Sequence, residues 1–309
     1  MSLLLIFPEQ GRENCLNTFR AFDSDIDITL WPEVTKPEVI DFIAIWGFSP
    51  IDYSIYPNLQ CVASLGAGAE HILQNPTLPK HVPVVRVVDP EMRQQMTEYI
   101  VLAVLNHRRY FFKYWQQKQE KHWSNIPLGS LENSTVGIMG VGSLGLDAAL
   151  KLKQLGLPVV GWCRSPKTIE GIEIFCGKQQ LDSFLAKTNI LICLLPLTAH
   201  TKNILNQDVF NKLPKGAYVV NVARGNLLVE EDLIKAIDSK QLSGACLDVF
   251  CEEPLPQTHP FWTHPDIMIT PHNSSNPIIK NSVKQTIENY YRLKNKEQLL
   301  NLVDRDWEY

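Results

Sequence analysis

The chain has 309 residues, of which 45% are hydrophobic and 20% are charged, and its formal net charge is −4 at pH 7. A chain of this length exceeds one ordinary hydrophobic core, so we expect two domains. The small acidic excess provides no general attraction to nucleic acid or to an anionic membrane, and any anion-binding site is therefore expected to be local and to take a small molecule.

Alternating strand-like and helix-like segments predict an α/β protein with parallel sheets. Toward the N-terminus, short apolar runs predict strands at 3–7, 26–30, 42–46, 61–65 and 84–87. One long helix is expected at 97–121, because this stretch has apolar residues at helical spacing and neither Gly nor Pro. We interpret this helix as the connection between the domains.

A second series of strands follows the long helix. Its members are expected at 135–140, 159–163, 190–195, 217–223, 244–250 and 267–270. Six parallel strands form a Rossmann-type doubly wound sheet. The helical tail from residue 277 lies outside this series. We therefore predict a dinucleotide-binding domain at 99–276 and a smaller flavodoxin-like α/β substrate domain built from 1–98 and 277–309.

Cysteine usage and hydropathy bear on the compartment. The seven cysteines include no CxxC pair, and an odd number without that spacing argues against a disulfide framework or a zinc knuckle. We expect mostly buried, reduced thiols in a cytoplasmic protein. The apolar run at 3–7 lacks the basic lead-in of a signal peptide. No stretch approaches the ~18 apolar residues of a membrane span.

A glycine-rich motif follows the first strand of the second series. The sequence GVGSLG at 140–145 fits G-x-G-x-x-G, with Gly140 for the tight turn, Gly142 for close phosphate approach and Gly145 for packing of helix on strand. Ser143 and Leu144 complete the loop, which opens a helix-compatible run. This context predicts a pyrophosphate site at the helix N-terminus, and the alternative is an ordinary tight turn.

The next strand ends in cations where an NAD-binding protein commonly has an acid. Arg164, Ser165 and Lys167 follow it. A guanidinium can bind the 2′-phosphate of NADPH in a bidentate manner, whereas a carboxylate would repel it. The cluster therefore favours NADPH over NAD, and the alternative is surface charge without a ligand.

Three later strands also end in polar residues. They lead into Arg224, into Asp248 with Glu252 and Glu253, and into His272. Ligands of open α/β sheets bind beyond the carboxyl ends of the strands, so we expect these side chains to meet. Arg224 can hold a carboxylate, His272 can transfer a proton near neutral pH, and an acid beside the imidazole can fix its tautomer. The alternatives are surface charges and a structural histidine.

The first domain carries its own glycine loop. Gly66, Ala67 and Gly68 follow the fourth strand, and exposed amides there could bind a small anion, although glycine-rich turns are also common. Trp46, at the end of the third strand, could line the pocket or serve as a core aromatic.

The whole chain resembles the D-isomer-specific 2-hydroxyacid dehydrogenases, and within that family the bacterial glyoxylate/hydroxypyruvate reductases. The resemblance is carried by SLGAGAEHIL, GIMGVGSLG, WCRSPK, LLPLTAHT, NVARGNLL, LDVFCEEPLP, TPH and the final VDR. It implies NADPH-dependent reduction of small 2-oxo acids such as glyoxylate and hydroxypyruvate. Arg224 would bind the substrate, His272 would donate the proton, and Glu253, not Glu252, would pair with His272.

The resemblance also implies further contacts and an assembly. The loop at Gly66, Ala67 and Gly68 would bind the substrate carboxylate. Cofactor-lining positions fall on Leu195, Pro196, Thr201, Val222, Ala223 and Asp248. Homodimers would form through the nucleotide domains near the long helix. One feature departs from the pattern: Asn273-Ser274-Ser275 after the histidine, which could alter substrate choice. Separately, Glu70 adds a negative charge beside the substrate loop.

Other classes of function are weaker fits. Bases and aromatics mix at 107–123, but an amphipathic interface helix explains them better than nucleic acid does. His259 and His264 do not have the spacing of a helical pair of metal ligands, so we expect no metal. A cofactor-sensing binding protein of the corepressor type, as found among relatives of the family, is the alternative function.

Overall fold

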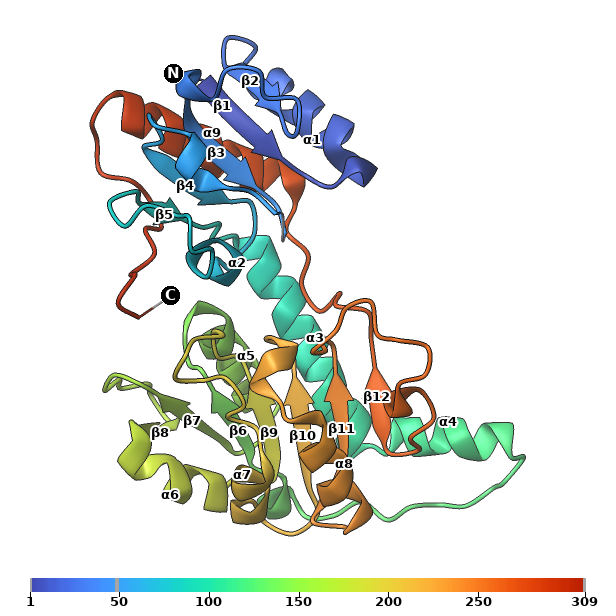
Figure 1. Cartoon of the computed structure of the whole chain (residues 1–309). Helices are drawn as coiled ribbons and strands as arrows, with labels where there is room; N and C mark the ends of the chain where they lie inside the picture. Colours follow the sequence, from blue (N-terminus) through green and yellow to red (C-terminus); the bar gives the residue numbers. More distant parts are fainter. Residues whose placement is uncertain (1, 48–49, 308–309) are drawn as a thin grey trace. The chain divides into compact units, whose positions relative to one another are not determined.

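The computed structural model describes residues 2–47 and 50–307 (Figure 1). The chain divides into two compact units, of which unit 1 comprises Met1–Met92 with Pro277–Tyr309 and unit 2 comprises Arg93–Asn276. Both the division at 92/93 and the predicted one at 98/99 fall within helix α3 (Pro90–Arg108). Because the helix is continuous, the sequence contains no loop there that would mark the domain boundary.

Unit 1 is built on a five-stranded parallel sheet in the order β2-β1-β3-β4-β5 (Figure 1). This is the flavodoxin-like order. The five predicted strands are present, with small shifts at their ends. They are β1 (Ser2–Ile6), β2 (Asp27–Leu30), β3 (Ile40–Ile45), β4 (Cys61–Ser64) and β5 (Val84–Val85).

Both faces of this sheet are covered, because side chains of a strand alternate between faces. Leu3 and Leu5 of β1 pack with α1 (Glu9–Phe22) and α9 (Ile279–Lys294), whereas Leu4 and Ile6 pack on the opposite face with α2 (Glu70–Leu73). The apolar stretch at the N-terminus is therefore a central strand, buried on both sides.

Unit 2 contains a seven-stranded parallel sheet in the order β12-β11-β10-β9-β6-β7-β8. Its core is the Rossmann order, with the reversal between β6 and β9. The strands are β6 (Val136–Met139), β7 (Val159–Cys163), β8 (Glu173–Cys176), β9 (Ile190–Cys193), β10 (Ala217–Asn221), β11 (Leu242–Leu247) and β12 (Ile267–Ile269). The prediction of six strands was wrong, since it omitted β8. This edge strand buries only Phe175 and so lacks an apolar run.

Helices cover both faces of the second sheet. Side chains of α3 and α5 (Ser143–Gln154) share one core cluster, and those of α6 (Leu181–Ala186), α7 (Gln207–Lys212) and α8 (Glu230–Asp238) share the other. Short 3₁₀ turns complete the secondary structure at Pro37–Val39, Tyr53–Ile55, Leu131–Ser134, Lys178–Gln180, Gly225–Leu227 and Pro260–Trp262.

The single helix predicted at 97–121 is two helices in the structure. α3 begins earlier, at Pro90, where the Asp89 carboxylate accepts the Glu91 N–H at 2.9 Å, and α4 spans Phe111–Gln119. Tyr110 separates them in a left-handed conformation with φ of 55°. Proline is tolerated in the first turn of a helix, and a left-handed tyrosine leaves no sequence signal. The prediction was therefore wrong about where the helix begins and about its continuity, whereas its end at 121 lies close to the end of α4.

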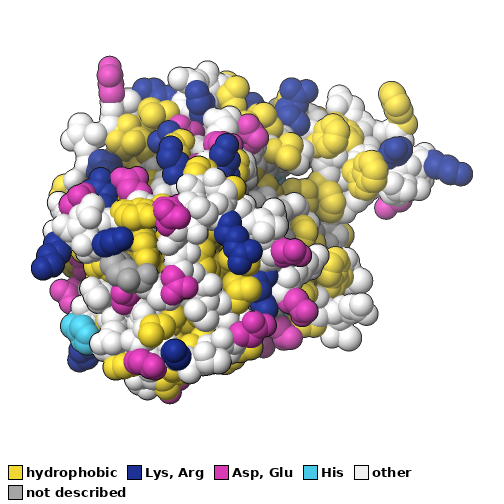
Figure 2. All heavy atoms as spheres, turned by 90° about the horizontal axis from the view of Figure 1, so that it is seen from above, with side chains coloured by type: hydrophobic (Ala, Val, Ile, Leu, Met, Phe, Trp, Pro, Cys, Tyr) yellow, Lys and Arg dark blue, Asp and Glu magenta, His cyan; other side chains and the backbone are white. Residues whose placement is uncertain are grey.

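The described residues carry a mixed surface. On the face that Figure 2 shows, Lys and Arg side chains are interspersed with Asp and Glu side chains. No helix within 2–47 and 50–307 is both long enough and apolar enough to cross a bilayer. All seven cysteines are thiols, and Cys15, Cys61, Cys193 and Cys246 are buried.

Candidate active site

His272 and Glu253 are joined by a short hydrogen bond beyond the carboxyl edge of the unit 2 sheet. His272 Nδ1 lies 2.6 Å from Glu253 Oε2, and the Phe250 N–H donates to Glu253 Oε1 at 2.9 Å. Burial raises the pKa of Glu253, but the hydrogen bonds from His272 and Phe250 and the charges of His272 and Arg224 outweigh it, so the net pKa lies below the usual 4.5. An ionised Glu253 selects the Nδ1–H form of the ring and leaves Nε2 to act on a ligand.

Arg224 lies close to this pair because of the glycine that follows it. A Cβ on Gly225 would lie 1.9 Å from the Phe250 carbonyl, so only glycine allows the two backbones to approach this closely. Arg224 Nη1 donates to the Ala223 carbonyl at 2.6 Å, and Asn221 Nδ2 holds the Arg224 carbonyl at 3.0 Å. The structure thus brings together the three predicted catalytic side chains, and their roles stay predictions.

Asp248 orders the loop that carries His272. Its side chain is fully buried and accepts the Thr270 hydroxyl at 2.6 Å and the N–H groups of Asn273 and Ser274 at 2.9 and 2.8 Å. The Asp248 carbonyl also accepts the His272 N–H at 2.9 Å. The departure at Asn273-Ser274-Ser275 is therefore a loop whose backbone is anchored on Asp248.

Sequence reasoning missed several residues that position the site. Asn221 is fully buried within β10, and Tyr99 of α3 shares a hydrogen bond of 2.5 Å with the Thr270 hydroxyl. The available signal was a polar residue inside an apolar strand, because a buried amide must find hydrogen-bond partners. Asn221 finds them in the Arg224 carbonyl and the Ala223 N–H.

The GVGSLG loop has the shape of a dinucleotide cradle. Gly140 has a φ of +102°, and a Cβ there would lie 2.7 Å from the Leu194 carbonyl oxygen. A Cβ on Gly145 would lie 2.1 Å from the Gly140 carbonyl oxygen, so this glycine lets α5 pack on the loop. Gly142 is the N-cap of α5, and Ser143 is its first residue. The amides of the loop and the helix N-terminus form a site that favours an anion.

The predicted phosphate cluster lies next to this loop. Lys167 Nζ donates to the Val141 carbonyl at 2.7 Å, which joins the segment after β7 to the middle of the glycine motif. Arg164, Ser165 and Lys167 are all exposed. Lys167 therefore contacts the loop that precedes α5, and Arg164 follows β7 at the same carboxyl edge of the sheet.

The remaining predicted cofactor positions follow β9 and β10. Gly140 packs against the backbone of Leu194 and Leu195, which places Leu195 and Pro196 beside the cradle. The Thr201 hydroxyl donates to the Pro196 carbonyl at 2.6 Å and so closes the loop after β9. Val222 and Ala223 are buried directly after β10. These contacts with a cofactor stay predictions.

In unit 1 the glycine loop is held by its neighbours. The Gly66 N–H donates to Ser64 Oγ at 3.2 Å, Ser64 Oγ donates to the Gly68 carbonyl at 2.7 Å, and Arg86 Nη1 donates to the Ala67 carbonyl at 3.3 Å. Arg86 was not predicted and adds a positive charge to the loop. Trp46 packs against Phe7 with ring centroids 5.8 Å apart.

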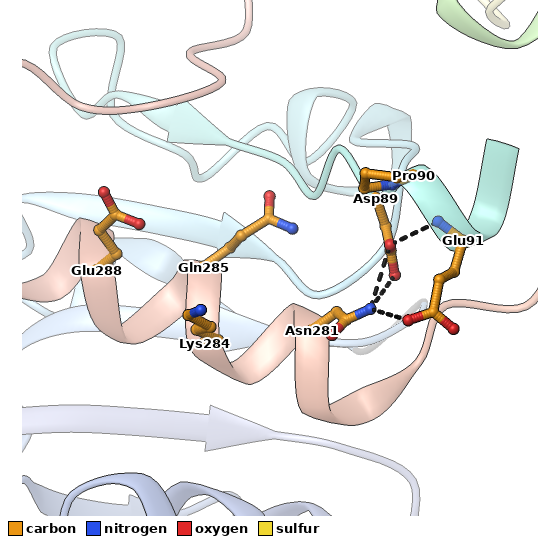
Figure 3. Close-up of a pocket in the computed structure, with 7 residues that line it drawn as sticks. All are labelled: Asp89, Pro90, Glu91, Asn281, Lys284, Gln285 and Glu288. Carbon is orange, nitrogen blue, oxygen red and sulfur yellow. Dashed lines mark hydrogen bonds between the residues drawn. The ribbon is translucent and has the colours of Figure 1, made fainter.

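A separate pocket of about 360 Å³ lies in unit 1 between the start of α3 and α9 (Figure 3). Asn281 Nδ2 points to the two acids, donating to the Asp89 oxygens at 3.2 and 3.1 Å and to Glu91 Oε1 at 3.1 Å. Lys284, Gln285 and Glu288 line it from α9. None of the described residues that line this pocket is a predicted site residue. The pocket therefore does not mark the predicted active site.

The two histidines weighed as metal ligands pair with different acids. His259 Nε2 lies 3.3 Å from Glu230 Oε2, and His264 Nε2 lies 3.5 Å from Asp238 Oδ1. Within the described parts of the chain, no three His, Cys, Asp or Glu side chains are grouped to hold a metal ion.

Comparison with known proteins gives consistent relatives. The family model for "D-isomer specific 2-hydroxyacid dehydrogenase, NAD binding domain" matches residues 101–274. The chain is 39% identical over 269 residues to glyoxylate/hydroxypyruvate reductase A of Yersinia enterocolitica, covering 85% of this chain and 86% of the relative. It is 42% identical over 251 residues to the protein of the same name from Serratia proteamaculans, covering 80% of each.

Solved structures agree over the full length. A D-isomer specific 2-hydroxyacid dehydrogenase from Xanthobacter autotrophicus in complex with NADPH and MES is 33% identical with a TM-score of 0.92, covering 100% of this chain and 99% of that one. An NADPH-dependent glyoxylate/hydroxypyruvate reductase from Sinorhizobium meliloti in complex with NADP and sulfate is 33% identical with a TM-score of 0.90, covering 100% of both chains. Together with the matching family model, these relatives show that the chain belongs to the D-isomer-specific 2-hydroxyacid dehydrogenase family.

Proposed function

We propose that the protein reduces small 2-oxo acids with NADPH, converting glyoxylate to glycolate and hydroxypyruvate to D-glycerate. The observation that carries the proposal is the 2.6 Å contact between His272 Nδ1 and Glu253 Oε2, with the charge of Arg224 acting on the same carboxylate. Membership of the family supports the reaction class. The names of the Yersinia and Serratia relatives support the substrates.

Each residue of the triad has a distinct role in this proposal. Arg224 binds the substrate carboxylate and polarises the neighbouring carbonyl, because a guanidinium can donate two parallel hydrogen bonds. His272, with protons on both ring nitrogens, donates the Nε2 proton to the carbonyl oxygen as negative charge develops on it. Glu253 accepts the Nδ1–H and keeps the ring in the orientation that the transfer requires. Asp248 holds the backbone on which His272 stands.

Within unit 1, the glycine loop offers amide donors that suit a carboxylate. The Gly66 N–H already donates to Ser64 Oγ, so we assign the binding to the amides of Ala67 and Gly68. The guanidinium of Arg86, which donates to the Ala67 carbonyl, makes this loop more favourable for an anion.

The glycine cradle and the cations fit NADPH. Gly140 and Gly145 let the loop pack on the backbone after β9 and let α5 pack on the loop, where a Cβ would clash, and the N-terminus of α5 would hold the pyrophosphate. Arg164, Ser165 and Lys167 would hold the 2′-phosphate, which favours NADPH over NAD. When bound, the reduced nicotinamide supplies the hydride. The Xanthobacter and Sinorhizobium structures, which contain NADPH and NADP, support this cofactor.

A homodimer is the assembly that unit 2 supports. The side chains of Phe111 and Trp115 on α4 are 65% and 53% exposed, and Trp123 beyond it is fully exposed. Large aromatic side chains exposed together are typical of a protein interface. We assign this surface, defined by Phe111, Trp115 and Trp123, to a second copy of the chain.

A steady-state assay with NADPH and either glyoxylate or hydroxypyruvate tests the function. We expect turnover, and a His272→Asn variant should bind NADPH normally while kcat falls by about 100-fold or more, as loss of a general acid predicts. Turnover at background level would favour the cofactor-sensing alternative. Full activity of the variant would show that His272 is not the proton donor.

A further inference from the structure

Two cysteines stand side by side at the end of the strands that lead to the phosphate cluster. β7 and β8 are parallel, and Cys163 and Cys176 are partners in their register. Neighbouring strands lie about 4.8 Å apart, which is within the range of about 4.4–6.8 Å that a disulfide requires between Cα atoms. Register partners also project to the same face of a sheet. The backbone therefore already has the spacing of a disulfide.

Both thiols donate hydrogen bonds to the segment that carries the predicted phosphate ligands. Cys163 Sγ donates to the Ser165 carbonyl at 3.1 Å, and Cys176 Sγ donates to the Arg164 carbonyl at 2.9 Å. Burial and the neighbouring Cys176 raise the pKa of Cys163 above its ordinary 9.0, and the opposing effect of Lys167 is smaller. The two sulfurs and Lys167 are thus close enough to influence one another.

This pair differs from the other cysteines in its setting. Cys15, Cys61, Cys193 and Cys246 are buried in the two cores, whereas Cys163 and Cys176 are only partly buried. β8 is the last strand in the order of its sheet, so reagents can approach the pair from the edge. Cys251 is exposed, but it lies on the other side of the sheet order, after β11.

We propose that Cys163 and Cys176 form a reversible disulfide that weakens the binding of NADPH. The oxidant is a low-molecular-weight disulfide such as oxidised glutathione. One cysteine thiolate attacks it and releases one small thiol, and the second cysteine thiolate then displaces the other. The two cysteines lose two protons and two electrons, and the small disulfide is reduced to two thiols.

The coupling to the cofactor follows from the lost protons. In the reduced protein Cys163 donates its thiol hydrogen to the Ser165 carbonyl, and Cys176 donates its thiol hydrogen to the Arg164 carbonyl. A disulfide has neither of these hydrogens. Oxidation removes both hydrogen bonds, so the backbone that presents these side chains loses two anchors. This part of the inference rests on the proposed role of Arg164 and Ser165 in binding the 2′-phosphate.

The test uses the full-length protein with Cys251→Ser, which removes the exposed thiol outside the pair. The protein is treated with oxidised glutathione at about pH 9.5, because the pKa of Cys163 is raised and its thiolate needs a higher pH to form. It is then alkylated and digested for mass spectrometry. We expect a peptide linked through Cys163 and Cys176. The Kd for NADPH should rise by about two- to tenfold, the equivalent of one lost hydrogen bond, while the Kd for NADH stays unchanged. Dithiothreitol should reverse both changes.

A matched control carries Cys163→Ser and Cys176→Ser in the same background. Serine hydroxyls can donate to the same carbonyls, so NADPH binding should equal that of the reduced protein and should not respond to glutathione. Free thiols at both Cys163 and Cys176, or a stable glutathione adduct on either of them, in the treated Cys251→Ser protein would overturn the disulfide. A linked peptide with unchanged NADPH affinity would overturn the coupling. If the reduced protein fails to bind NADPH, the proposed cofactor is wrong, and the peptide map still decides whether the disulfide forms.

Discussion

Glu253 acts on the ring of His272 through both geometry and charge. Its side chain is 34% exposed, yet it accepts hydrogen bonds from His272 and from the Phe250 N–H. A carboxylate that gains donors in the folded state has a lowered pKa. Glu253 should therefore stay ionised under mildly acidic conditions.

The Glu253→Gln variant should lose this effect. We expect kcat/KM to fall by about 10- to 100-fold, because an amide carries no charge to stabilise the protonated ring. In the native protein the catalytic contribution of the ionised Glu253 is lost only as the pH falls through its folded pKa, which lies below the ordinary 4.5. A kcat/KM profile against pH measures both effects. Glu252→Gln, at the neighbouring exposed acid, should change neither, and equal losses in both variants would contradict the pairing.

Arg164 should decide between the two nicotinamide cofactors. Its replacement by Asp puts a carboxylate where the 2′-phosphate is proposed to bind, and a charge-assisted hydrogen bond corresponds to about 10- to 100-fold in affinity. We expect the ratio of kcat/KM for NADPH to that for NADH to fall by at least that factor. Lys215→Asp, which makes the same charge change just before β10, at the opposite end of the strands, is the control. If Arg164→Asp leaves the preference for NADPH over NADH unchanged, the cluster of Arg164, Ser165 and Lys167 is only surface charge and does not bind the 2′-phosphate.

At the scale of elements, α3 is attached to the unit 2 sheet by a stacked pair. The His107 ring lies 3.9 Å from that of Tyr218 on β10, with an angle of 15° between the planes. Burial, together with the charge of Lys113, lowers the pKa of His107 to about 4. The ring therefore remains neutral in the folded chain at pH values where it would be protonated after unfolding.

The stability of unit 2 should consequently depend on pH. Below the ordinary value of 6.5 the unfolded chain binds a proton that the folded one does not bind until about 4, so acidification through this window lowers the free energy of unfolding. Urea denaturation of the native protein should show this decrease, by about 1–3 kcal/mol. The His107→Phe variant keeps an aromatic ring but has no titrating group, so its free energy of unfolding should depend less on pH. The His122→Gln variant, at an exposed histidine, should keep the pH dependence of the native protein.

The α3–α4 break and β8 show where local patterns stop being informative. Apolar spacing continues through Tyr110, but the backbone there turns left-handed and ends α3. β8 has one buried residue and is a strand because β7 offers it hydrogen-bond partners. Tertiary contacts determine both features, because the local sequence at Tyr110 and in β8 has no strong conformational preference of its own.

At the scale of the whole molecule, the aromatic surface of α4 predicts the assembly. Changing Phe111 and Trp115 together to Asp would place charges in the proposed interface, where desolvating them is costly. We expect sedimentation to show a dimer for the native protein and a monomer for the variant. Leu155→Asp alters a similarly exposed apolar residue at the end of α5 and should leave the dimer intact. A native monomer would contradict the assignment.

The sequence by itself determined the α/β class, the two parallel sheets, the glycine cradle and the polar residues that leave the strands. These features depend on hydrophobic periodicity and on chain order, which are local properties. It also brought Arg224, Glu253 and His272 to one edge, because parallel strands end on the same side.

Only the tertiary structure decided how those residues are held. Asp248 anchors the His272 loop, Gly225 lies against the Phe250 carbonyl, and Cys176 lies beside Cys163. Each of these contacts joins segments that are distant in the chain, through register or close packing. Such distances are set when the whole fold is packed, so no single stretch of sequence encodes them.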